Sequence, residues 1–225
     1  MIPNQEYYSQ NYILFLKLCN FLCIFAKHMR HESQNIFFIS DLHLGHTNVL
    51  RYDNRPFASV DEMHNTLVER WNSVVGDDDV VYFLGDLFFS RIDTAVWFLN
   101  NVRGRISCVL GNHDREDQIR RLGRFENIYP YGVGIDIRDD NSPELKRNQG
   151  YRHVVLSHYP ILSWNRAHHG SFHLHGHCHG NLLRTNPDYY RGRVMDVGCN
   201  LIDYTPISFL EVSELLGNRS TSFDN

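Results

Sequence analysis

The chain has 225 residues, of which 42% are hydrophobic and 21% are charged, and it shows no internal repeat, low-complexity tract or domain linker. This balance is typical of a globular protein with one full core. The net charge of -4 gives no footprint for tight nucleic-acid binding, although bound metals can supply the positive charge that a phosphoester substrate needs.

Residues 1–35 differ in pattern from the rest, and we treat them as an N-terminal extension of a domain that spans residues 36–225. The apolar stretch at residues 12–26 is interrupted by polar residues and is too short for a membrane span. Three interpretations of residues 1–28 stay open: a helix packed on the domain, a leader that contacts a membrane, or a wrongly assigned start. We favour the last, with translation beginning at Met29, because Met29 lies a few residues before the first predicted strand.

From residue 36 onward, five short apolar runs each end at polar side chains. The runs cover residues 36–40, 80–84, 106–110, 153–157 and 171–175. Continuous apolar runs are typical of buried strands in a parallel sheet. Ligands bind at the carboxyl ends of such strands, so five endings of this kind predict one shared site.

Between these strands, the spacing of apolar residues predicts helices. The first begins with Asp61 as its cap and has an apolar face formed by Met63, Leu67 and Trp71. A second helix is predicted at residues 93–101, with Val96 and Leu99 facing the sheet, and a third at residues 115–125. Segments 48–56 and 181–192 are predicted to be loops, and 194–197 and 207–212 to be late strands.

Histidine is the unusual component of the composition, with 14 copies. Imidazole nitrogens and carboxylate oxygens are ligands for divalent metals, and the strand endings supply enough of both for two ions. Asp86 is the predicted shared ligand, because it follows Gly85 at the end of a central strand. The complete predicted ligand set is Asp41, His43, Asp86, Asn112, His158, His177 and His179.

The residues near this set suggest a hydrolytic mechanism. A hydroxide that bridges two metals is a strong nucleophile at neutral pH and can attack phosphorus in line. His113 can donate a proton to the departing oxygen, a role typically worth roughly 10²–10⁴-fold. Asp114 can orient that imidazole or cap the helix that follows. Candidate substrate contacts are His46, Asn48, Arg51 and Arg55, with ordinary surface salt bridges as the alternative for the two arginines.

Taken in order, the motifs resemble those of the calcineurin-like metallophosphoesterase superfamily. The series is Asp41-x-His43, Gly85-Asp86, Gly111-Asn112-His113-Asp114, His158 and Gly176-His177-x-His179. Further segments are similar to a small bacterial and phage subgroup of single-domain phosphoesterases: Asn54-Arg55-Pro56-Phe57, Trp71-Asn72 and Leu174-His175-Gly176-His177.

The resemblance implies an α/β fold built as a four-layer α/β/β/α sandwich. It implies that one metal is held by Asp41, His43, Asp86 and His179. It implies that the other is held by Asp86, Asn112, His158 and His177, with His113 near the leaving group. Members use divalent manganese, iron, zinc, nickel or cobalt, and we favour manganese here.

The leading hypothesis is therefore a dinuclear metal-dependent phosphoesterase acting on a small phosphomonoester or phosphodiester, with nucleotide-derived compounds among the candidates. A nuclease of the same superfamily would need a basic groove and would usually have an additional domain, and the sequence shows neither. A catalytically silent scaffold would tend to lose ligands, whereas the motif here is complete. The five cysteines lack paired zinc spacing and no secretion signal precedes them, which favours reduced thiols in the cytoplasm.

Overall fold

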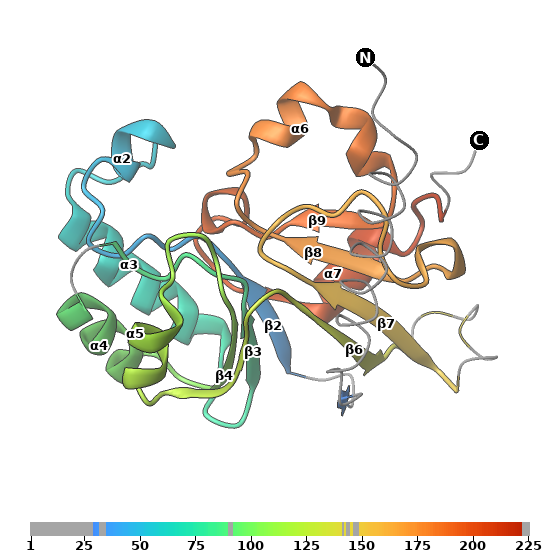
Figure 1. Ribbon diagram of the computed structural model, residues 1–225, viewed down its shortest axis with the longest axis horizontal. Helices are drawn as coiled ribbons and strands as arrows, with labels where there is room; N and C mark the ends of the chain where they lie inside the picture. Colours follow the sequence, from blue (N-terminus) through green and yellow to red (C-terminus); the bar gives the residue numbers. More distant parts are fainter. Residues whose placement is uncertain are drawn as a thin grey trace, which may run out of the picture.

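The computed structural model describes residues 29–31, 35–89, 92–140, 142, 145 and 149–221, in which two five-stranded sheets pack face to face (Figure 1). In the first sheet the strand order is β10 (Ile207–Ser208), β2 (Ile36–Ile39), β3 (Val80–Phe83), β4 (Arg105–Val109) and β5 (Phe125–Tyr129). In the second sheet it is β1 (Met29–His31), β6 (Val133–Arg138), β7 (Tyr151–Leu156), β8 (Phe172–His175) and β9 (Val194–Asp196). The interpretations of residues 1–28 concern a segment outside the described residues.

Parallel pairing dominates both sheets. In the first sheet β2, β3, β4 and β5 are parallel and β10 is antiparallel to β2. In the second sheet β6 and β7 are antiparallel, and the other neighbouring pairs are parallel. Because parallel strands end at one edge of a sheet, the segments that follow β2, β3 and β4 lie together.

Helices cover the outer face of each sheet (Figure 1). Against the first sheet lie α3 (Val60–Val74), α4 (Ile92–Asn101) and α5 (Glu116–Arg121), with Trp71 and Phe98 in the same buried cluster as Phe83. Over the second sheet lie α6 (Asn181–Thr185) and the 3-10 helix η3 (Pro187–Arg191), where Tyr189 packs on Val194. The interior between the sheets holds apolar side chains from both, together with those of α7 (Phe209–Leu216). This layering confirms the predicted α/β/β/α sandwich.

Three helix predictions require correction in their details. The N-cap of α3 is Ser59 rather than Asp61, because the Ser59 hydroxyl accepts a hydrogen bond from the N–H of Glu62 at 3.1 Å. In α4 the Val96 side chain is exposed, and the buried face is formed by Ala95, Phe98 and Leu99. The third helix, α5, ends at Arg121 rather than near residue 125.

The chain is also helical in places where strands or loops were predicted. Of residues 207–212, Ile207 and Ser208 pair with β2, and α7 begins at Phe209. The Ser208 hydroxyl accepts from the N–H of Glu211, and the Glu211 carboxylate accepts from the N–H of Ser208. This capping box outweighs the strand-like apolar pattern. Short helices also interrupt the two predicted loops, namely α2 (Val49–Tyr52), α6 and η3.

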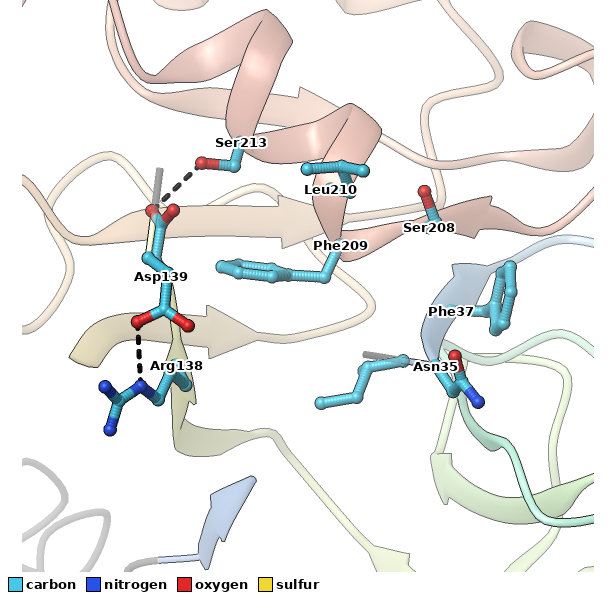
Figure 2. A pocket seen from close by; sticks show the side chains of 10 residues that line it. Asn35, Phe37, Arg138, Asp139, Ser208, Phe209, Leu210 and Ser213 are labelled. Carbon is cyan, nitrogen blue, oxygen red and sulfur yellow. Dashed lines mark hydrogen bonds and ion pairs between the residues drawn. The ribbon is translucent and has the colours of Figure 1, made fainter. Parts of the chain in front are cut away.

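A pocket of about 380 Å³ lies at the amino end of β2 (Figure 2). It is lined by residues of β2, α7 and the end of β6, among them Phe37 and Phe209, and by Asp139, which directly follows β6. Asp139 accepts a hydrogen bond from the Ser213 hydroxyl at 2.9 Å (Figure 2). Because the predicted ligands follow the carboxyl end of β2, this pocket is separate from the candidate site.

Among the described residues, no helix has both the length and the apolar character needed to cross a membrane.

Candidate metal centre

All seven predicted ligands lie beyond the carboxyl ends of strands from the two sheets. Asp41 and His43 follow β2, Asp86 follows β3, Asn112 follows β4, His158 follows β7, and His177 and His179 follow β8. The two sheets are joined at this point, because the N–H of Ser40 donates to the carbonyl of Val197 at 3.0 Å. Ligands from opposite sheets therefore meet at one seam.

The donor atoms form two overlapping groups, in each of which they lie within 4.8 Å of one another: Asp41 with His43 and His179, and Asp41 with Asp86 and His158. Nε2 of His43 lies 3.2 Å from Nε2 of His179 and 3.6 Å from Oδ2 of Asp86. Nε2 of His158 lies 3.5 Å from the same Asp86 oxygen. Ligands on one metal with bonds of about 2.1 Å lie roughly 3.0–3.4 Å apart, so these separations fit divalent ions.

Asn112 joins the second group to His177. Its side-chain oxygen Oδ1 lies 3.1 Å from Nε2 of His158 and 2.8 Å from Nδ1 of His177. The structure therefore brings the amide oxygen and both imidazoles together, as the sequence predicted.

Most of the ligand backbone is left-handed. The φ angles are 59° at Asp41, 50° at His43, 60° at Asp86, 69° at His177 and 48° at His179. This conformation costs a non-glycine residue roughly 1–2 kcal/mol and tends to cluster at functional sites. The first two segments support each other, because the N–H groups of Asp41 and His43 donate to the carbonyls of Gly85 and Asp86 at 2.9 and 3.0 Å.

Burial tunes the ligands for a cation. Burial raises the pKa of the Asp41 carboxyl to about 7, so its anion lacks enough compensating positive charge from the protein. Burial, together with the neighbouring His179, lowers the pKa of His43 to about 2, which keeps that imidazole neutral and able to donate a lone pair. A neutral imidazole beside an undercompensated carboxylate fits a divalent metal ion.

Two glycines are required for this close approach. A Cβ atom on Gly176 would overlap the Asp41 carboxylate and the Ser40 hydroxyl. A Cβ atom on Gly111 would overlap the Asp86 carboxylate and its main chain. The backbone of one loop thus packs directly on the ligands of another.

His113 lies at the exposed rim of the centre. Its ring centroid is 5.5 Å from that of His43 and 5.6 Å from that of Phe89. The main-chain N–H of His113 donates to Oδ1 of Asp86 at 2.9 Å. The imidazole is therefore close to the predicted metals and open to solvent, as a proton donor to a leaving group should be.

Asp114 requires a correction. Its carboxylate accepts hydrogen bonds from the N–H groups of Asp86, Leu87 and Gly111 at 2.8, 3.1 and 2.9 Å. The N-cap position of α5 is occupied by Arg115, without a side-chain cap. In place of orienting the imidazole or capping the helix, Asp114 connects the segments that follow β3 and β4.

The four candidate substrate residues occupy different environments. Asn48 and Arg51 are exposed, and His46 stacks on Phe89 with ring centroids 4.4 Å apart. Arg55 is buried, and its guanidinium donates to main-chain carbonyls beneath the ligands. Its position favours a supporting role over phosphate binding.

Sequence reasoning missed Asp53, whose Oδ2 lies 2.7 Å from Nδ1 of the predicted ligand His179. A single acidic residue in a polar loop is usually a turn residue, so no local sequence pattern indicates this contact. It also missed Tyr159, whose ring centroid is 4.7 Å from that of His177.

Comparisons with known proteins agree with this arrangement. Residues 34–196 match the family model for calcineurin-like phosphoesterases. The chain is 32% identical over 186 residues to an uncharacterized protein of Methanocaldococcus jannaschii, covering 81% of this chain and 92% of that protein. It is 33% identical over 177 residues to the Gene 66 protein of Mycobacterium phage D29, covering 68% and 84%.

A solved structure supports the same fold. The crystal structure of a protein of unknown function from Aquifex aeolicus superposes with a TM-score of 0.62 and 22% identity, covering 81% of this chain and 99% of that chain. With the family match over most of the chain and the convergence of its motifs, this protein belongs to the calcineurin-like phosphoesterase family.

Proposed function

We propose that the protein is a dinuclear metal-dependent phosphoesterase that hydrolyses a small phosphomonoester or phosphodiester. The observation that carries this proposal is the position of Asp86 Oδ2, 3.6 Å from Nε2 of His43 and 3.5 Å from Nε2 of His158. The two imidazoles come from opposite sheets and approach the same carboxylate oxygen. This arrangement supports Asp86 as a ligand shared by two cations.

The remaining ligands divide between the two cations. One would be held by Asp41, His43, Asp86 and His179, and the other by Asp86, Asn112, His158 and His177. When bound, divalent ions activate water and stabilise charge on phosphoryl oxygens. A set of oxygen and imidazole donors suits manganese, iron, zinc, nickel or cobalt, and manganese is our first choice.

The chain's own groups orient the ligands and supply a proton. Nδ1 of His158 lies 2.8 Å from the carbonyl of Leu84, which fixes the proton on Nδ1 and turns the Nε2 lone pair toward Asp86. The N–H of His177 donates to the Asp41 carboxylate at 3.0 Å. His113, at the exposed rim, donates its proton to the departing oxygen of the substrate.

The rim also bears on substrate class. Phe89 beside His113 is 39% exposed, and Tyr159 beside His177 is 47% exposed. Exposed rings on two sides of a site favour a leaving group that carries an aromatic ring, and nucleotide-derived esters are such compounds. The net charge of -4 favours a small substrate over a nucleic acid. The free thiols Cys108, Cys178 and Cys199 support a cytoplasmic location.

The test is hydrolysis of bis(nitrophenyl) phosphate and nitrophenyl phosphate with manganese, with and without a chelator. We expect metal-dependent turnover, and we expect His113→Ala to lower kcat by roughly 10²–10⁴-fold while manganese binding is retained. His168→Ala, which alters an exposed histidine of η2 (Ala167–His169), is the matched control and should keep full activity.

Two outcomes would contradict the proposal. Absence of turnover with every divalent ion tested would favour a catalytically silent scaffold. Rapid cleavage of oligonucleotides together with slow hydrolysis of small esters would favour a nuclease.

A further inference from the structure

A buried ion pair lies beneath one half of the metal centre. The Arg55 side chain is fully buried and that of Asp53 is 10% exposed, with Nη2 of Arg55 3.0 Å from Oδ2 of Asp53. Nε of Arg55 donates to the same oxygen at 3.2 Å. Buried charges are costly unless each is paired and hydrogen-bonded, so the further partners of this pair indicate its role.

The Asp53 carboxylate contacts a predicted metal ligand that is distant in the sequence, His179. Its Oδ2 lies 2.7 Å from Nδ1 of His179. Because a carboxylate only accepts, Nδ1 carries the ring proton and donates a hydrogen bond to Asp53. Nε2 of His179 is then left with a lone pair. This nitrogen lies 3.2 Å from Nε2 of His43 and 3.7 Å from Oδ1 of Asp41.

Arg55 holds the other ligands through their main chain. Its Nη2 donates to the carbonyl of Asp41 at 2.9 Å, and its Nη1 donates to the carbonyl of Leu42 at 3.0 Å. These carbonyls belong to the segment in which Asp41 and His43 have left-handed backbone. One guanidinium thereby fixes a strained ligand segment and also the carboxylate that orients His179.

From these contacts we propose that Asp53 and Arg55 are positioning residues that assemble the half of the centre formed by Asp41, His43 and His179. The proposal rests on the metal centre described under the proposed function. A carboxylate that accepts the second N–H of a metal-binding histidine fixes the ring's tautomer and orientation. The segment of residues 48–56, which was predicted to be a loop with Asn48, Arg51 and Arg55 as candidate substrate contacts, then also serves to hold a metal.

The test is titration of the purified full chain with manganese, followed by calorimetry and by electron paramagnetic resonance. We expect two bound ions in the wild type. In Asp53→Asn we expect one of them to bind about 10–100-fold more weakly and the other to be little changed. The control is Asp188→Asn, which removes the carboxylate of an exposed pair with Arg191 at 3.0 Å and should retain both ions.

A second readout reports orientation directly. In long-range ¹H–¹⁵N spectra, His179 of the wild type should be protonated on Nδ1, and Asp53→Asn should shift its tautomer population. Arg55→Lys keeps the buried charge but lacks the planar fork that reaches two carbonyls and a carboxylate, so it should weaken the same ion. If Asp53→Asn does not fold, Arg55→Lys decides the question by the same titration.

A folded Asp53→Asn that binds both ions with wild-type affinity and keeps the His179 tautomer would overturn the positioning role. Ion binding is measured here without hydrolysis, so this failure is separate from failure of the proposed function. A wild type that binds two ions but hydrolyses no ester would contradict the phosphoesterase proposal, whereas a weakened ion in Asp53→Asn would still support the role of Asp53.

Discussion

The two halves of the candidate centre are built differently. The half that contains Asp41, His43 and His179 rests on the buried Arg55–Asp53 pair, and the residues Asp41 and His43 are 0% and 4% exposed. In the other half the buried ligand is His158, whereas Asn112 and His177 are exposed. The ring of His177 packs on that of Tyr159, which is itself 47% exposed, and its Nδ1 contacts the side chain of the exposed Asn112.

This difference has a physical consequence. Ligands fixed by buried hydrogen bonds are oriented before a metal binds, whereas exposed ligands lose side-chain freedom when it binds. We therefore expect the buried half to bind its cation more tightly than the exposed half. Asp86, whose carboxylate lies between the halves, should couple them.

The largest effect is expected where both halves are broken at once. Asp86→Asn removes the negative charge shared by the two groups of ligands, so both cations should bind more weakly. We expect kcat/KM to fall by more than about 10³-fold, beyond the loss typical of a single transition-state contact. Steady-state hydrolysis and manganese titration measure this, and a variant that keeps both ions and most activity would exclude Asp86 as the shared ligand.

A smaller effect, confined to the buried half, concerns pH. Burial raises the pKa of Asp41 from 3.8 to about 7, so the folded protein binds this proton more tightly than the unfolded chain. The contribution of Asp41 to metal-free stability therefore falls as pH rises from about 4 to about 7. Asp41→Asn removes this titration. The Tm of this variant in chelator, relative to that of the wild type, should therefore rise by a few degrees as the pH increases from about 4 to about 7.

Differential scanning calorimetry at a series of pH values measures the Asp41 effect. Addition of manganese should stabilise the wild type more than Asp41→Asn. A Tm difference that stays constant between about pH 4 and about pH 8 would show that the carboxyl has no raised pKa.

The smallest effect is expected in the exposed half. Tyr159→Ala removes a ring that packs beside His177 but makes no buried ion pair with it. We expect the affinity for manganese to change by less than about threefold, well below the 10–100-fold expected for loss of a carboxylate partner. A larger loss of manganese affinity in Tyr159→Ala than in Asp53→Asn would contradict the expectation that the buried half depends more on its supporting residues than the exposed half.

The sequence was sufficient for the main elements of the fold and for a candidate set of ligands. Continuous apolar runs identified the five strands, and the polar residues after them identified all seven candidate ligands, because strand endings in a parallel sheet share an edge. The same patterns placed α3 and α4 almost correctly. Where apolar spacing was ambiguous, at residues 207–212, the local capping box of Ser208 and Glu211 decided for a helix.

The tertiary structure decided the roles of side chains whose partners are distant in the chain. Asp53 and His179 are separated by 126 positions, and no local pattern links them. Arg55 has the charge expected of a residue that binds phosphate, and Asp114 has the charge expected of a residue that orients a catalytic histidine. In the fold, both side chains form hydrogen bonds with main-chain groups. Periodicity in a sequence reports which face of an element is buried, whereas the partner of a buried polar group is chosen only when separate elements pack together.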